Sequence, residues 1–310
     1  MKEAEQFHFM IDLNDAGERI DKYISDELEG CSRSYVQKII KDGLVFVNGK
    51  AVKPNYKLNS EDNIDVTVPQ LTVPEIEAEN IPLDILYEDE DIIVINKPKG
   101  MVVHPAAGHY TNTLVNALMY HCKDQLSGIN GVMRPGIVHR IDMNTTGVLV
   151  ACKNDLAHNA IAAQLSVHSI TRKYCAIVHN TFSQEEGTID APIGRNPVDR
   201  KKMAIDKKNG RRAVTHYRVL ENFNKFSYVE CQLETGRTHQ IRVHMASIGH
   251  PLLGDDVYTS AKSPYNLTGQ TLHARVLGFI HPRTSQYMEF EAPIPEYFQN
   301  VLQDLKMKNR

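Results

Sequence analysis

The chain has 310 residues, which is too long for one small domain, so two domains are expected at roughly 100–200 residues each. Its 42% hydrophobic and 24% charged residues exclude disorder, collagen and a coiled coil as descriptions of the whole chain. The longest apolar runs, Val148–Cys152 and Tyr174–Val178, are far shorter than the roughly 20 residues of a membrane-spanning helix. No basic stretch followed by an apolar one opens the sequence, so we expect a cytoplasmic protein.

Cysteine and histidine spacing gives no sign of a metal site. The five cysteines contain no C-x-x-C pair, and their odd, scattered number argues against a disulfide framework. Free and mostly buried thiols are the expectation. The fourteen histidines show no ligand spacing, and the glycine motifs that bind nucleotide phosphates are absent. We therefore expect no metal and no cofactor.

The net charge of −3 hides a strong local segregation of charge. Residues 31–57 carry six basic residues and one acid, and residues 195–218 carry nine basic residues and two acids. Between them, residues 60–91 carry eleven acids and no base. Any one such run is commonly only a solvated face. Two basic runs in separate predicted domains favour a nucleic-acid partner.

The sequence of residues 1–66 predicts a small module that begins with two helices. Apolar side chains at helical spacing indicate a helix near residues 20–28. A second helix follows, capped by Ser32 or Ser34, and Gly43 is placed to end it in a left-handed conformation.

A β-hairpin completes this module. Leu44–Val47 reads as a strand, and Asn48-Gly49 is typical of a type I′ hairpin turn. Basic side chains that could contact phosphates lie along the second helix and just past the turn: Arg33, Lys38, Lys41 and Lys50. The pattern resembles the S4 RNA-binding domain over about 50 residues, which implies that this module binds structured RNA.

A linker and a larger domain follow. Residues 67–80 contain two prolines and no helical or strand period, so they predict a linker, and residues 81–310 form the second domain. Strands are expected over 92–95, 147–152, 171–178, 214–219 and 226–233, and helices over 113–120, 154–165 and 238–248. These elements do not alternate as βαβ units, so the fold class is α+β around a large mixed, mainly antiparallel sheet.

The segment PGIVHRIDMNTTGVLVACKND, residues 135–155, carries one candidate catalytic group. Its Asp142 lies on a polar loop between two apolar stretches, which is how a loop carboxylate is held rigidly for catalysis. The alternative is that Asp142 merely caps a turn.

The segment GRTHQIRVHMASIGHPLLGD, residues 236–255, predicts a helix with two faces. Ile241, Met245 and Ile248 form its core stripe, while His239 and Arg242 share another face. Arg242 could pair with a loop carboxylate or a phosphate, or it could be an ordinary surface arginine.

These two segments, with INKPKGMVVHP (95–105) and ITRKYCAIVHN (170–180), closely resemble the RluA-type pseudouridine synthases. The resemblance runs from about Arg19 to about Ile294 and implies site roles. Asp142 would be the catalytic residue, Tyr174 would stack on the target base, Arg242 would pair with the aspartate, and Arg140 would bind substrate. Against the family pattern H-R-L-D-K-D-T-S-G, the chain keeps Asp142, Thr145 and Gly147 and departs at Ile141, Met143, Asn144 and Thr146.

The reaction implied by this resemblance detaches uracil from its sugar, turns it and rejoins it through C5. Such an isomerisation needs no redox cofactor, and one carboxylate can serve it. Asp142 could add to C6, capture C1′ or remove the C2′ proton, and the sequence leaves the three routes open. The expected substrate is a uridine of 23S ribosomal RNA, and the expected state is a monomer.

Two other functions compete with this one. A non-catalytic RNA-binding factor for ribosome assembly would keep the fold without forming pseudouridine. A nucleoside glycosidase would release free uracil, although such hydrolases typically use a second catalytic carboxylate and no comparable acidic motif is present.

Overall fold

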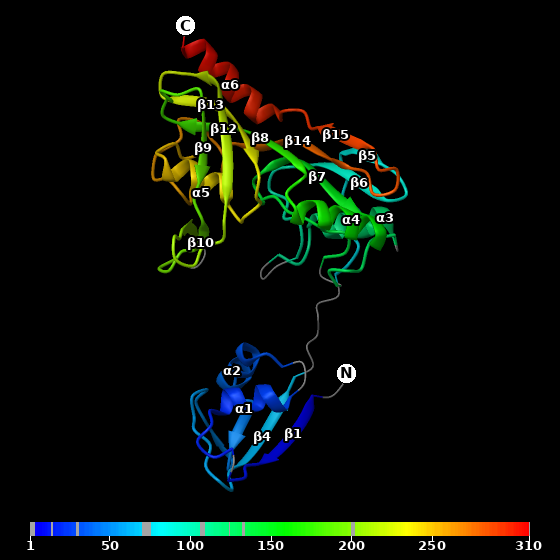
Figure 1. Cartoon of the computed structure of the whole chain (residues 1–310), viewed down its shortest axis with the longest axis vertical. Helices are drawn as coiled ribbons and strands as arrows, with labels where there is room; N and C mark the ends of the chain where they lie inside the picture. Colours follow the sequence, from blue (N-terminus) through cyan, green and yellow to red (C-terminus); the bar gives the residue numbers. More distant parts are fainter. Residues whose placement is uncertain are drawn as a thin grey trace. The chain divides into compact units, whose positions relative to one another are not determined.

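A computed structural model of the chain describes residues 4–13, 15–28, 31–69, 76–105, 109–123, 125–131, 134–199 and 202–309. The chain divides into two compact units, Met1–Pro74 and Glu75–Arg310 (Figure 1). In the segment expected as a linker, residues 67 and 68 still belong to a strand, and residues 70–75 lie outside the described part.

The first unit is a four-stranded sheet with two helices. Its elements are β1 (Glu5–Met10), α1 (Ile20–Glu27), α2 (Arg33–Lys41), β2 (Val45–Val47), β3 (Lys50–Ala51) and β4 (Asn63–Val68). The antiparallel sheet has the order β1-β4-β2-β3. Both predicted helices and the hairpin are confirmed, whereas β1 and β4 were not predicted.

The local signals in this unit act as expected. The Ser32 hydroxyl accepts a hydrogen bond from the Tyr35 backbone N–H at 3.3 Å and so caps α2. Gly43 ends the helix region with φ +74°. Asn48 and Gly49 both have positive φ, 49° and 73°, as a type I′ turn requires.

The second unit is built on a nine-stranded sheet and has a separate two-stranded sheet. Its elements are β5 (Ile85–Glu88), β6 (Ile92–Lys97), α3 (Leu114–Cys122), β7 (Thr146–Cys152), α4 (Asp155–Ser166), β8 (Thr171–His179), β9 (Glu186–Asp190), β10 (Ile193–Arg195), β11 (Met203–Ile205), β12 (Val214–Asn222), β13 (Phe226–Leu233), α5 (Gln240–Ser247), β14 (Leu272–Ile280), β15 (Tyr287–Glu291) and α6 (Glu296–Lys308). The strand order is β5-β6-β7-β14-β8-β13-β12-β9, with β15 beside β14. Only β7 and β14 pair in parallel among these strands, so the predicted α+β class with a mainly antiparallel sheet is confirmed.

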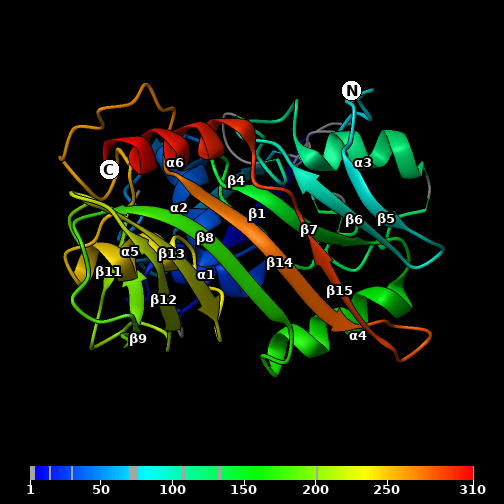
Figure 2. The same cartoon turned by 90° about the horizontal axis from the view of Figure 1, so that it is seen from above.

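The side chains of the central strand β8 alternate between the two faces of this sheet. Tyr174, Ala176 and Val178 belong to the large core, whereas Cys175 and Ile177 point to the opposite face. There they pack against α6, which is drawn in red in Figure 2. Tyr174 therefore faces away from α6.

One predicted core stripe is partly wrong. Ile241 and Met245 are buried, but Ile248 is 39% exposed. The reason is that α5 ends at Ser247 and Ile248 is its C-cap, so the helical period that would have turned Ile248 inward has already ended.

The cysteine prediction is confirmed. Four of the five cysteines are buried, Cys31 is half-buried, and all are free. Within the described part of the chain no helix is long and apolar enough to span a bilayer.

Candidate active site

The loop that carries Asp142 is anchored by backbone hydrogen bonds on both sides of the carboxylate. The Asp142 carbonyl accepts from the Thr145 N–H at 3.0 Å. The next carbonyl, that of Met143, accepts from the Gly100 N–H at 3.0 Å and from Lys97 Nζ at 3.1 Å. The carboxylate is 19% exposed, so a rigid frame presents it without burying it completely.

The departures from the family pattern fit their surroundings. The Met143 side chain is exposed. Asn144 packs tightly on Gly269, because a Cβ added to Gly269 would lie 2.3 Å from the Asn144 amide nitrogen. The Thr146 hydroxyl is 2.9 Å from Nδ1 of His273 on β14. These contacts hold the loop against the segment that precedes β14 and the start of that strand.

Arg242 on α5 joins Asp142 to a second carboxylate. Its Nη1 donates to Asp142 Oδ2 at 3.1 Å, while Nε and Nη2 donate to Asp255 at 2.7 and 3.0 Å. Arg242 is only 5% exposed. Burial works to lower its pKa, but the hydrogen bonds and charges of Asp255 and Asp142 outweigh this and raise it, so the guanidinium stays charged. The contact expected between Arg242 and Asp142 is thus present.

The start of α5 is fixed to the sheet by Gln240. Its amide nitrogen donates to the Val214 carbonyl at 2.9 Å, and its amide oxygen accepts from the Thr235 hydroxyl at 2.8 Å. The preceding residue, His239, has a left-handed backbone (φ 56°, ψ 21°), which turns its ring toward the site. Its Nε2 lies 3.8 Å from Asp142 Oδ1.

His239 is in turn held by Tyr258. The His239 Nδ1 lies 2.7 Å from the Tyr258 hydroxyl, which also accepts from the Met203 backbone N–H at 3.0 Å. Burial lowers the pKa of His239, although the charge of Asp142 opposes this shift. The lowered pKa favours the neutral ring at neutral pH.

Tyr174 borders the same cavity as Asp142. It lies on β8 between β13 and β14 and is 8% exposed. A cavity of about 50 Å³ is lined by Asp142, Tyr174 and Arg242 together with Arg140. Burial raises the pKa of Tyr174 and outweighs the opposing charge of Arg172, while the charge of Asp142 adds to the rise, so the phenol remains protonated at neutral pH. The structure therefore brings all four of these sequence-predicted residues to one cavity.

The basic residues expected on the first unit differ in their surroundings. Lys38, Lys41 and Lys50 are exposed and form no ion pair with another described residue. Arg33 instead donates to the buried carboxylate of Asp21 at 3.0 Å, which holds part of its charge within the unit.

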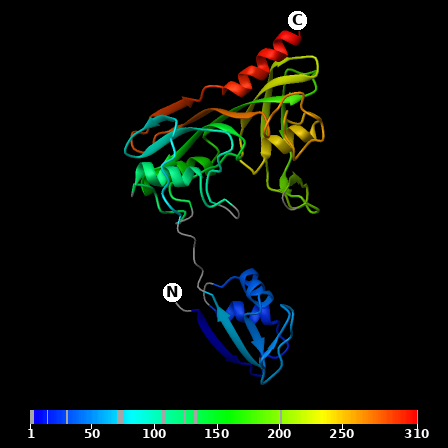
Figure 3. The same ribbon diagram turned by 180° about the vertical axis from the view of Figure 1, so that it is seen from behind.

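The second basic run surrounds the β10–β11 hairpin, which lies beside α5 (Figure 3). Lys207, Lys208 and Arg211 are exposed there, while Arg200 and Lys201 lie outside the described residues. The bond from Met203 to Tyr258 connects this hairpin to His239 and so to the Asp142 site.

Sequence reasoning missed three residues that support the site. Asp255 and Tyr258 come from the loop after α5, and only the folded loop brings them to Arg242 and His239. Lys97 is fully buried, and its Nζ lies within hydrogen-bond distance of three carbonyl oxygens, those of Pro98, Met101 and Met143. Its signal was a lysine two positions after the apolar run Ile92–Ile95, close enough to the predicted core to be buried.

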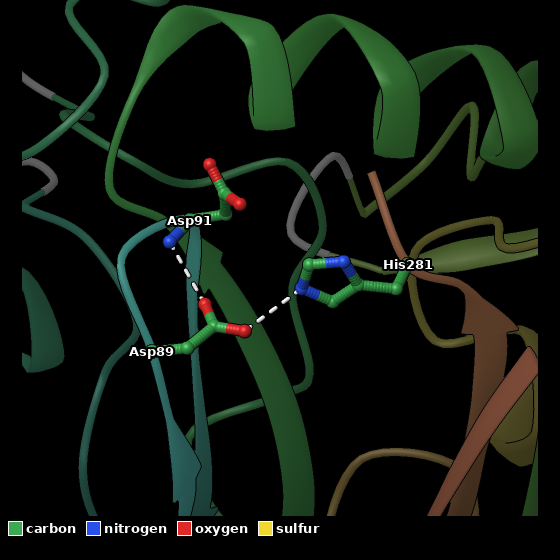
Figure 4. Close-up of side chains that lie close together, drawn as sticks. All are labelled: Asp89, Asp91 and His281. Carbon is green, nitrogen blue, oxygen red and sulfur yellow. Dashed lines mark hydrogen bonds and ion pairs between the residues drawn. The ribbon is translucent and has the colours of Figure 1, made fainter. Parts of the chain in front are cut away.

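One cluster has the composition of a cation site. Asp89, Asp91 and His281 place ligand atoms within 4.8 Å of one another (Figure 4). Asp91, however, is held by Arg283 at 2.6 and 2.7 Å, and Asp89 accepts hydrogen bonds from His281 and from backbone N–H groups. The Arg283 guanidinium keeps the pKa of Asp91 low, at about 2. These carboxylates already have protein partners, so we interpret the cluster as a structural contact that connects the β5–β6 turn to the end of β14.

Comparisons with known proteins agree with this geometry. Residues 91–247 match the family described as RNA pseudouridylate synthase, and residues 18–64 match the S4 domain. The chain is 56% identical over 289 residues to Uncharacterized RNA pseudouridine synthase YlyB of Bacillus subtilis, covering 93% of this chain and 94% of that one. It is 47% identical over 304 residues to Ribosomal large subunit pseudouridine synthase D of Zymomonas mobilis, covering 95% and 96%.

Solved structures have the same fold. Human RNA Pseudouridylate Synthase Domain Containing 4 matches with a TM-score of 0.56 and 28% identity, over 72% of this chain and 92% of that one. Fold and site define an RNA-modifying enzyme joined to an S4 module. The chain belongs to the RNA pseudouridine synthase family, as an enzyme of the RluA type.

Proposed function

We propose that this enzyme converts specific uridines of 23S ribosomal RNA to pseudouridine, with Asp142 as the catalytic carboxylate. The observation that carries the proposal is the single cavity in which the Arg242-held Asp142 faces the space beside Tyr174. The large-subunit substrate is supported by relatives named Ribosomal large subunit pseudouridine synthase D, at 47% identity in Zymomonas mobilis and 44% in Pseudomonas aeruginosa. A cytoplasmic location and a monomeric state belong to the same proposal.

The chemistry balances without a co-reactant. The bond between N1 of uracil and C1′ breaks, the base turns, C5 bonds to C1′, and the proton on C5 is lost as N1 gains one. Asp142 assists as a nucleophile at C6 or C1′, or as the base at C2′. Arg242 holds the carboxylate toward the cavity, and its second carboxylate partner, Asp255, fixes the arginine.

The target base has to leave its stack to reach Asp142, which costs a few kcal/mol. Tyr174 offers it an aromatic face, worth about 1–3 kcal/mol in single-strand binders. The cavity measures only about 50 Å³, so side chains at its mouth must move to admit a base. Arg140 is the side chain best placed to do so, because it is exposed and no described residue holds its guanidinium.

The S4-like unit, residues 1–66, would hold the RNA through Arg33, Lys38, Lys41 and Lys50, while residues 67–80 link it to the catalytic domain, residues 81–310. Three exposed lysines support this part of the proposal. Their charges can contact phosphates without regard to sequence, and the catalytic cavity then selects the uridine.

The test maps pseudouridines in ribosomal RNA from a strain that lacks the gene and from the same strain complemented with wild type, Asp142→Asn or Asp256→Asn. Asp142→Asn is isosteric but lacks a nucleophilic or basic carboxylate, so we expect no restored pseudouridine. Asp256 is an exposed carboxylate outside the cavity and is the matched control, which should restore the wild-type pattern.

Each alternative has its own outcome in this experiment. Identical maps with and without the gene would favour the non-catalytic assembly factor. Release of free uracil by the purified protein would favour the glycosidase. Activity of Asp142→Asn within tenfold of wild type would remove Asp142 from its role.

A further inference from the structure

A second and larger cavity adjoins the Asp142 cavity. It measures about 330 Å³ and shares Arg140, Tyr174, Leu233 and Arg237 with the smaller one. Its titratable lining, apart from Tyr174, is wholly basic: His139, Arg140, His168, Arg172 and Arg237. No acid is among the described residues that line it, although acids outnumber bases in the chain as a whole.

Arg172 is the most unusual of these residues. It lies on β8 two positions before Tyr174 and is only 7% exposed. Its Nη2 donates to the Glu234 carbonyl at 2.8 Å, but its Nε has no partner and no described carboxylate pairs with it. The Glu234 carboxylate is engaged elsewhere, with Arg212 at 2.8 Å and His216 at 2.9 Å.

A buried, unpaired guanidinium is costly, because neither water nor a counter-charge stabilises it. Burial, with the charge of Arg237, works to lower the pKa of Arg172, although an arginine stays protonated in proteins. The molecule therefore holds a buried positive charge beside this cavity, and one of its donors, Nε, has no acceptor among the described residues.

His139 supplies a neutral donor to the same cavity. Its Nε2 accepts from the Val150 backbone N–H at 3.1 Å, so the ring proton must lie on Nδ1. Burial lowers its pKa to about 3, so the ring is neutral at neutral pH. No described residue accepts from Nδ1.

We propose that this cavity binds a phosphodiester group of the RNA, adjacent to the nucleotide whose base enters the Asp142 cavity. The proposal rests on the proposed function and adds a subsite to it. A guanidinium matches the paired oxygens of a phosphate. Because Tyr174 and Arg140 line both cavities, an anion bound here would lie next to the site of the reacting base.

Gly236 offers an independent way to disturb the subsite. A Cβ at Gly236 would lie 2.6 Å from Arg172 Nη1 and 3.8 Å from Cζ of the same guanidinium. Gly236 does not have a positive φ, so its backbone accepts alanine. Gly236→Ala should therefore displace the Arg172 head group and keep its charge.

The experiment uses an RNA oligonucleotide containing one uridine identified by the pseudouridine mapping, with a single neutral methylphosphonate replacing each neighbouring phosphate in turn. Single-turnover kcat/KM is measured for wild type, Arg172→Gln, Gly236→Ala and Lys173→Gln. Lys173 is the matched control, because it is the next residue on β8 and its side chain points to the other face.

We expect one methylphosphonate position to cost wild type and Lys173→Gln about tenfold to a hundredfold in kcat/KM, the range of a charge-assisted hydrogen bond. The same substitution should cost Arg172→Gln almost nothing, because the contact is already lost. Gly236→Ala should lie between the two. Circular dichroism verifies that each variant is folded.

Additive losses at every position, or an equal loss in all four proteins, would overturn the phosphate subsite while leaving pseudouridine formation by wild type intact. Inorganic phosphate provides the second arm. Competitive inhibition that Arg172→Gln abolishes, together with additive methylphosphonate losses, would assign the cavity to a free anion instead of RNA. Absence of pseudouridine with unmodified RNA would contradict the proposed function and not the subsite alone.

Discussion

The Tyr174 side chain carries two separable features, an aromatic face and a hydroxyl. Its hydroxyl forms no hydrogen bond with another described residue, and burial raises its pKa. Tyr174→Phe should therefore keep most RNA binding and stability, and its loss in single-turnover rate reports what the hydroxyl does. Tyr174→Leu also loses the aromatic face, so its rate should be lower than that of Tyr174→Phe by about fivefold to a hundredfold, given stacking worth about 1–3 kcal/mol.

The comparison of the two variants is the decisive measurement. Rapid-quench assays at saturating enzyme give the rates, and filter binding gives the affinities. Equal rates for Phe and Leu would show that the ring does not stack on the target base.

Lys97 makes stability depend on pH. Burial lowers its pKa from the ordinary 10.5 to about 7, although Asp142 opposes the shift. Between these two values the unfolded chain binds a proton that the folded chain lacks, so the free energy of unfolding should rise with pH from about 7 to about 10.5. The contribution is of the order of a few kcal/mol.

Lys97→Met should lose this rise, whatever its absolute stability, because the titrating group is gone. Urea denaturation at pH 7.5 and pH 9.5 measures the change for each protein, and the difference between the two changes belongs to Lys97. Parallel pH profiles for wild type and variant would contradict the lowered pKa.

At the scale of elements, local patterns predicted what depends on neighbours in sequence. The S4-like helices, their Ser32 cap and the Asn48-Gly49 turn follow from short-range rules, and they are present. The strand predicted over residues 226–233 is also present as β13, with Ser227, Val229 and Cys231 buried on one face. Such elements could be predicted because each residue's conformation is set within a few positions.

Elements and contacts that depend on distant partners were missed. β14 joins β7 to β8, and its pairing gives no local signal. Helix α6 does have a helical apolar period, with Phe298, Val301, Leu302 and Leu305 buried, but its place against β8 follows only from the sheet. Asp255 likewise gains its role only when its loop returns to Arg242.

The parallel pairing of β7 and β14 depends on Gly147. Its φ is +110°, and a Cβ there would lie 2.0 Å from the Ala274 carbonyl oxygen, a backbone atom that cannot turn away. Gly147→Ala should destabilise the unit by about 2–4 kcal/mol through backbone strain and strand separation. Since Asp142 lies five residues earlier on the same anchored loop, catalysis should fall as well.

Gly128→Ala is the matched control, because nothing lies within 4 Å of its Cβ position and its φ is not positive. Its stability should stay within about 1 kcal/mol of wild type. Urea denaturation of both variants measures the contrast. If Gly147→Ala unfolds at the wild-type urea concentration, the close approach of β7 to β14 is not required.

At the scale of the whole molecule, the two units have separate hydrophobic cores. The buried residues of the first unit, such as Ile24 and Val36, form one cluster, and the large cluster of the second contains no residue from it. A chain starting at Glu75 should therefore fold, with the melting behaviour of the second unit in the full protein, because no shared core is cut.

The same truncation should weaken RNA binding in a particular way. Each lost phosphate contact removes about 0.7–0.9 from the slope of log affinity against log salt. Loss of Lys38, Lys41 and Lys50 should thus flatten the slope by about 2 to 3, and Arg33 should add less because Asp21 holds it. The full chain with all three lysines changed to alanine should reproduce most of that flattening without removing any fold. An unchanged slope in both proteins would mean that the first unit does not contact phosphates, and the basic β10–β11 hairpin would then be the element whose charges hold the RNA.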